Sequence, residues 1–92
     1  MTSKETKKKK KDKQEINPEG EYCLVLHNDD IHSFDYVTDA LIEICEHSYE
    51  QAMQCTLITH HKGSCEIRKG TLEKLKQMKE AFSLKDLITT IN

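Results

Sequence analysis

The sequence has no apolar stretch long enough to cross a bilayer, and it holds only one proline and three glycines. A spanning helix needs about 18 consecutive apolar residues. The lysine-rich start of the chain is not followed by the apolar segment and cleavage site of a signal peptide. We therefore expect a cytoplasmic protein, and its 92 residues are enough for one domain with a thin core.

Closely paired cysteines are missing too. The four cysteines are widely spaced, without the C-x-x-C pairs common in disulfide scaffolds and zinc ribbons: Cys23, Cys45, Cys55 and Cys65. A metal site can be drawn from two cysteines and two histidines, but its ligand pairs lack the usual spacing. Those four residues are Cys55, His60, His61 and Cys65. We expect reduced thiols in the core, with no metal and no other cofactor.

Sequence signatures of catalysis are absent as well. There is no glycine-rich phosphate loop and no H-E-x-x-H metal motif. His60 could act as a general base oriented by Asp29, but this scheme lacks a nucleophile. Cys55 is five residues before His60 and off its helical face. We expect that the protein is not an enzyme.

Charge is divided unevenly along the chain. Residues 1–20 carry seven lysines and four acids, whereas the remaining residues carry seven bases and twelve acids. The first segment also has little apolar content, so we predict a disordered lysine-rich arm at 1–20 and a folded domain at 21–92. Basic arms often bind nucleic acid, but the domain has no arginine-rich face, and we favour a solvated leader.

The first half of the domain predicts one strand and two helices. Residues 22–26 form a short apolar run that ends at polar residues 27–30, as a strand entering a loop would. Ser33 can cap a helix that stops near residues 46–47. Ser48 opens a Ser-x-x-Gln capping box for a second helix, and Gly63 is a natural end for that helix.

The second half predicts a strand, a helix and a strand. Cys65 and Ile67 alternate within a strand at residues 64–69, and Thr71 can cap a third helix. Residues 87–91 are β-prone and predict the last strand. The order β-α-α-β-α-β in so short a chain predicts an α+β fold of two layers, with helices packed on a sheet.

Candidate site residues follow the first strand and precede the end of the second helix. Asn28, Asp29 and His60 offer an amide oxygen, a carboxylate and a ring nitrogen, which are acceptors that together suit a cation. Two plainer interpretations stay open. Asn28 to Asp30 can form a turn that bonds its own backbone, and His60 and His61 can oppose the negative end of a helix dipole.

Several motifs together resemble a known family. They are LVLHNDD at residues 24–30, FDYV at 34–37, EQA at 50–52 and HHKG at 60–63. In this order and spacing they resemble the Clp protease adaptor ClpS, from about residue 21 to residue 92 and most strongly through Gly63. The resemblance implies an α/β sandwich of three strands and three helices. It also implies an adaptor that binds the first residue of N-degron substrates, typically Leu, Phe, Tyr or Trp, and delivers them to a Clp AAA+ unfoldase-protease for degradation.

The resemblance also implies roles for individual residues. Asn28, Asp29 and His60 would hold the substrate's α-ammonium group, and Asp30 would support the loop. The hydrophobic pocket would be lined by Phe34, Thr56, Thr59 and Leu87. Thr56 and Thr59 stand where the family usually has a methionine gate and an aliphatic residue, so we expect a roomier pocket or a changed preference for the first residue.

The expected partners are substrate proteins and the N-terminal domain of a Clp unfoldase, with no nucleic acid or membrane, and the adaptor is expected to be a monomer. Residues 1–20 would either help control engagement of the unfoldase or only aid solubility. The alternative is an interaction module of the same fold, like the C-terminal domain of the ribosomal stalk protein, without N-degron binding. Fold alone does not separate these two hypotheses.

Overall fold

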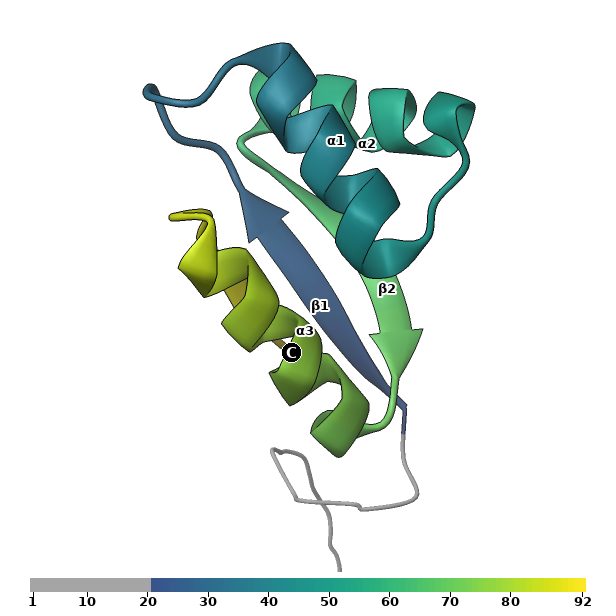
Figure 1. Cartoon of the computed structure of the whole chain (residues 1–92). Coiled ribbons are helices and arrows are strands. Elements are labelled where there is room, and N and C mark those ends of the chain that lie inside the picture. The colour runs from purple at the N-terminus through teal and green to yellow at the C-terminus, as the bar shows by residue number, and fades with distance from the viewer. Residues whose placement is uncertain (1–20) are drawn as a thin grey trace, which may run out of the picture.

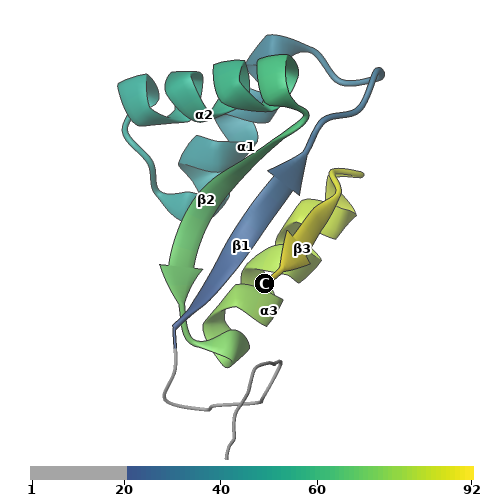
Figure 2. The same cartoon turned by 180° about the vertical axis from the view of Figure 1, so that it is seen from behind.

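A three-stranded antiparallel sheet and three helices form the part of the chain described by the computed structural model, residues 21–92. The predicted arm at residues 1–20 lies outside the described residues. The elements are β1 (Tyr22–His27), α1 (Phe34–Cys45), α2 (Tyr49–Lys62), β2 (Ser64–Gly70), α3 (Leu72–Leu84) and β3 (Thr89–Ile91). β1 is the central strand of the order β2-β1-β3, and it is antiparallel to both neighbours (Figures 1 and 2). The predicted element order is confirmed.

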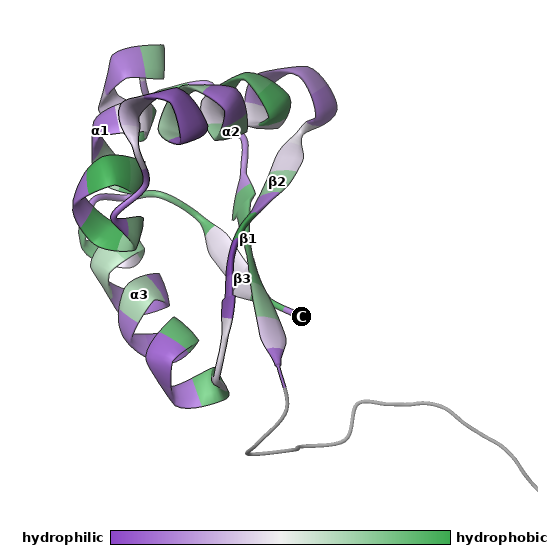
Figure 3. Cartoon of the chain, turned by 90° about the vertical axis from the view of Figure 1, so that its right-hand side faces the viewer, coloured by the Kyte–Doolittle hydropathy of each residue, from purple (hydrophilic) through white to green (hydrophobic). Residues whose placement is uncertain are grey.

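The helices form a second layer against the sheet. Figure 3 shows α1 and α3 on the same side of the strands, with α2 near one end of the sheet. Alternate residues of β1 point to opposite faces of a sheet, and Leu24 and Leu26 are buried in the core with Leu41, Leu75 and Phe82. This packing confirms the predicted two-layer α+β sandwich.

Side-chain caps explain where the three helices begin. Ser33, Ser48 and Thr71 each accept a hydrogen bond from the backbone N–H three residues ahead, at 3.1, 3.1 and 3.3 Å. Such bonds satisfy N–H groups that a helix start leaves without a partner. α2 ends at Gly63, which has a φ of 93°. All three predicted starts and the predicted end of α2 are confirmed.

The last strand is shorter than predicted. It begins at Thr89 rather than Leu87. Asp86 has a φ of 63°, and the backbone N–H of Leu87 donates to the carbonyl of Phe82 at 3.0 Å. The chain therefore turns after α3 and directs Leu87 into the core before pairing with β1 begins. Strand propensity alone did not reveal this turn.

Within residues 21–92, no helix combines the length and the apolar character needed to span a membrane.

Candidate functional site

Three segments meet at the end of β1. The backbone N–H of Asn28 donates to the carbonyl of Gly63 at 2.9 Å, and the N–H of His27 donates to the carbonyl of Ile88 at 2.9 Å. The first bond joins the loop after β1 to the end of α2, and the second joins β1 to the segment before β3. These main-chain bonds bring together regions that are far apart in the sequence.

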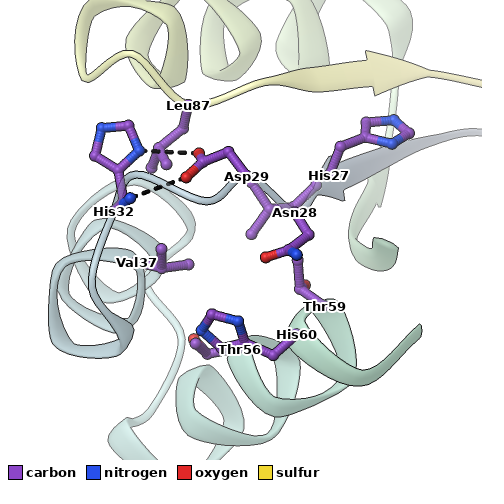
Figure 4. A pocket seen from close by; sticks show the side chains of 10 residues that line it. His27, Asn28, Asp29, His32, Val37, Thr56, Thr59, His60 and Leu87 are labelled. Atoms are coloured by element: carbon purple, nitrogen blue, oxygen red, sulfur yellow. Dashed lines mark hydrogen bonds and ion pairs between the residues drawn. The ribbon is translucent and has the colours of Figure 1, made fainter. Parts of the chain in front are cut away.

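A hollow that is partly open to solvent lies between these segments (Figure 4). Six of the residues predicted for the site line it: Asn28, Asp29, Thr56, Thr59, His60 and Leu87. Four further residues also line it: Leu26, His27, His32 and Val37. The acceptors predicted from the loop and from the second helix thus lie around the same cavity.

Asp29 is held firmly by its own loop. Its Oδ1 accepts hydrogen bonds from the backbone N–H groups of Ile31 and His32, both at 2.9 Å, and its Oδ2 lies 2.9 Å from Nδ1 of His32. Partial burial acts to raise the pKa of Asp29. The hydrogen bonds from His32 and Ile31 outweigh it and hold the pKa below its ordinary value of 3.8. The carboxylate is therefore negative and fixed in direction at neutral pH.

Asn28 and His60 lie on facing sides of the hollow. Figure 4 shows the Asn28 amide and the His60 imidazole turned toward the same space, and both residues are exposed to solvent. The ring of Phe34 stacks on that of His60, with centroids 5.8 Å apart and planes 14° apart. Since Phe34 is the first residue of α1, this contact links the start of α1 to the end of α2.

The deeper wall of the hollow is mostly apolar but contains two hydroxyl groups. Leu26, Val37 and Leu87 are buried there, at 1%, 8% and 3% exposure. The Thr56 hydroxyl donates to the carbonyl of Ala52 and the Thr59 hydroxyl donates to that of Cys55, both at 2.8 Å. A side chain entering from the rim would thus meet aliphatic surface and two threonine oxygens.

Comparison with known proteins assigns the family. The family model described as ATP-dependent Clp protease adaptor protein ClpS matches residues 17–85. The chain belongs to the ClpS family.

Individual relatives differ in how much of their length is shared. The ClpS adapter protein of Oleidesulfovibrio alaskensis is 42% identical over 50 residues, which cover 54% of this chain and 48% of that protein. The chain thus spans about half the length of that relative. The ClpS adapter protein of Campylobacter jejuni strain RM1221 is 36% identical over 67 residues, which cover 68% of this chain and 70% of that protein.

A solved structure shares the fold of this ClpS family member. It is the structure of Agrobacterium tumefaciens ClpS2 bound to L-phenylalaninamide, with a TM-score of 0.74 and 23% identity. The match covers 83% of this chain and 98% of that chain. At this level of identity the likeness concerns the fold.

Two residues predicted for the ClpS site lie outside the wall of the hollow. Phe34 does not line it but stacks on His60 at its edge. Asp30 is exposed, and within the described residues its carboxylate has no hydrogen-bond partner. The loop contacts that we expected of Asp30 are made by Asp29, and a supporting role for Asp30 stays a prediction.

The structure adds four residues that sequence analysis did not assign to the site. Val37 lies three residues after Phe34 in α1, so helical spacing could have found it. Leu26 and His27 end β1, and the His27 ring turns away to Thr90, with Nε2 2.8 Å from Oγ1 (Figure 4). His32 gave no signal, because a histidine in a polar loop is typical of exposed surface.

Among residues 21–92, no three histidine, cysteine or acidic side chains are grouped so that they could hold a metal ion. The four cysteines are free, and three of them are buried.

Proposed function

We propose that this protein is an adaptor that binds the free N-terminal residue of N-degron substrates and delivers them to a Clp AAA+ unfoldase-protease. In this proposal Asn28, Asp29 and His60 hold the α-ammonium group, and the apolar wall behind them receives the first side chain. The observation that supports it most directly is the presence of these three acceptors around one hollow.

The chemistry of a free N-terminus explains how these three acceptors would select their ligand. A free α-amino group has a pKa of about 8, so near neutral pH it is mostly a cation with three donors. An acetylated or internal peptide nitrogen is neutral and has at most one. An acceptor that the bound peptide shields from water and leaves without a partner costs about 1–3 kcal/mol, which is roughly ten- to a hundredfold in affinity.

The apolar wall would provide the second part of the selection. Burying a Leu or Phe side chain there would contribute about 1.5–3 kcal/mol. The related ClpS2 structure contains L-phenylalaninamide, a small molecule with both a free α-amino group and an aromatic side chain. The hollow of this protein has the acceptors and the apolar surface that suit those two groups.

The alternative hypothesis, an interaction module without N-degron binding, gains no support from this arrangement. A module that binds only through its outer surface has no need to place an amide, a carboxylate and an imidazole around a cavity. His60 facing Asn28 across the hollow (Figure 4) favours the adaptor.

Fluorescence anisotropy tests the proposal. We expect a peptide that starts with Leu or Phe to bind at least about tenfold more tightly than its N-acetylated twin. Asn28→Ala and His60→Ala should each weaken binding of the free peptide by roughly ten- to a hundredfold. His61→Ala is the matched control, because His61 is exposed beside His60 but does not line the hollow. Equal binding of the two peptides by the wild-type protein would rule out the adaptor.

A further inference from the structure

His32 connects the proposed amine clamp, which is Asn28, Asp29 and His60, to the segment that carries Leu87. Its Nδ1 lies 2.9 Å from Oδ2 of Asp29, and its ring stacks on that of Tyr36, with centroids 4.7 Å and planes 15° apart. The Tyr36 hydroxyl donates to the carbonyl of Lys85 at 2.9 Å. Lys85 is two residues before Leu87, so one chain of contacts links the loop, α1 and the segment that carries the pocket leucine.

This chain of contacts fixes the direction of the Asp29 carboxylate. Oδ1 is occupied by two backbone N–H groups, and His32 occupies one side of Oδ2. The side chains of His32 and Asp29 are only 14% and 16% exposed. An acceptor held in place before its ligand arrives binds more tightly, because less freedom is lost on binding. Oδ2 keeps an acceptor position free for an ammonium group.

We propose that His32 is a positioning residue of the amine clamp, which orients the Asp29 carboxylate and makes capture of a chain start weaker in acid. This inference depends on the proposed function, because it assigns a role within the same site.

The acid dependence follows from where a proton would add. The Asp29 carboxylate is an acceptor, so Nδ1 of His32 carries a hydrogen in the neutral and in the protonated ring, and the bond persists in both. Protonation instead adds a positive charge beside the place where the α-ammonium binds. The Asp29–His32 pair then changes from a net charge of −1 to zero, and the attraction for a cation is reduced.

The other titratable groups around His32 are distinguishable from it. His27 from β1 and His60 from α2 also line the hollow, but the His27 ring is bonded to Thr90. α1 contributes Tyr36 through the ring stack. Lys85, from the segment after α3, directs its ammonium group to Glu43 at 3.1 Å. Substitution of His32 alone therefore isolates its share of any pH dependence.

Two substitutions of His32 separate positioning from charge. His32→Asn offers an amide N–H at about the place of Nδ1 but does not titrate, whereas His32→Ala removes the donor altogether. Affinity for a Leu-starting peptide is measured by anisotropy at pH 7.5 and pH 5.5. At pH 7.5 we expect His32→Ala to lose about five- to tenfold in affinity, and His32→Asn to recover most of that loss.

The pH profile supplies the second readout. Between pH 7.5 and pH 5.5 the wild-type affinity should fall roughly three- to tenfold more than that of His32→Asn, because only the wild type gains a charge at position 32. His61→Asn removes a histidine outside the hollow and should follow the wild-type profile. Tyr36→Phe keeps the ring stack but loses the bond to Lys85, and it should retain the wild-type pH profile.

Parallel pH profiles for the wild type and His32→Asn would overturn the role of His32, even if the wild type prefers free over acetylated peptides. If the wild type did not prefer the free peptide at pH 7.5, the proposed amine clamp itself would be ruled out. Should His32→Ala not fold, as judged by circular dichroism, the comparison of the wild type with His32→Asn still decides the question.

Discussion

At the scale of single residues, two threonines determine how polar the deeper wall of the hollow is. The Thr56 hydroxyl donates to the carbonyl of Ala52 and lies 3.0 Å from the hydroxyl oxygen of Thr38, so it has two hydrogen-bond partners inside the core. Within residues 21–92, the Thr59 hydroxyl donates to the carbonyl of Cys55 and accepts no hydrogen bond. Its oxygen can therefore still accept one, although the residue is only 4% exposed. A phenol or indole donor could use that oxygen, whereas a Leu or Phe side chain could not.

Replacing Thr59 should therefore shift the preference for the first residue. We expect Thr59→Val to raise affinity for Leu- and Phe-starting peptides by about three- to tenfold relative to a Tyr-starting peptide, because an unpaired acceptor costs about 1 kcal/mol or more. Anisotropy with peptides that differ only in residue one measures this ratio. Thr56→Val, in contrast, should mainly lower stability, because it leaves the buried Thr38 hydroxyl without its partner. An unchanged ratio of Leu to Tyr binding in Thr59→Val would contradict the prediction.

At the scale of elements, the turn that ends α2 connects this helix to the loop after β1. Gly63 adopts a left-handed conformation with a φ of 93°, and its carbonyl accepts the N–H of Asn28. A Cβ added at Gly63 would meet no heavy atom within 4 Å, so only the backbone conformation disfavours another residue. The same turn holds the end of α2, with His60, beside the loop after β1.

Gly63→Ala should lower the free energy of unfolding by about 1–2 kcal/mol, which is the cost of a left-handed conformation for a residue with a Cβ. It should also weaken peptide binding, since relaxing the strain moves Asn28 relative to His60. Urea unfolding and anisotropy measure the two effects. Gly70→Ala is the control, because Gly70 does not have such a φ and its added Cβ would meet only Leu75 at 3.8 Å. A Gly63→Ala protein as stable as Gly70→Ala would argue against the proposed strain.

At the scale of the whole molecule, buried thiols make global stability sensitive to alkaline pH. Burial raises the pKa of Cys45 from 9.0 to about 11. Burial, reinforced by the neighbouring Cys55, raises the pKa of Cys65 to about 12. The folded protein holds these protons more tightly than the unfolded chain. This stabilisation is complete below about pH 9 and is lost as pH rises through the folded values.

We therefore expect the free energy of unfolding to fall as pH rises above 9, by at most about 1.4 kcal/mol per pH unit for each thiol. Cys45→Ala should be less stable than the wild type at pH 7.5 because it leaves space in the core. Its stability should, however, decline less steeply between pH 8.5 and 10.5. Urea unfolding at a series of pH values measures both slopes. Equal slopes for the two proteins would show that Cys45 does not contribute to this pH dependence.

Most of the fold could be predicted because its signals are local. Ser33, Ser48 and Thr71 cap helices through bonds that reach only three residues ahead, so the residues that set each start lie next to it in the sequence. The start of β3 could not be placed in this way. The turn at Asp86 is also closed by local bonds, from its N–H to the carbonyl of Ser83 and from the N–H of Leu87 to that of Phe82. Its left-handed residue is not a glycine, however, so the usual sequence signal of such a turn is missing. Strand propensity reflects only the β-prone residues that follow.

The sequence by itself determined the helices with their caps, the core residues of β1 and the types of side chain available to bind a cation. Tertiary structure decided that residues from the end of β1, the end of α2 and the turn before β3 line one hollow. It also decided that Asp29 is oriented by His32 and that His32 is tied through Tyr36 to Lys85. The physical reason is range: caps and helical spacing involve neighbours along the chain, whereas the hollow exists only after distant segments form bonds such as Asn28 to Gly63.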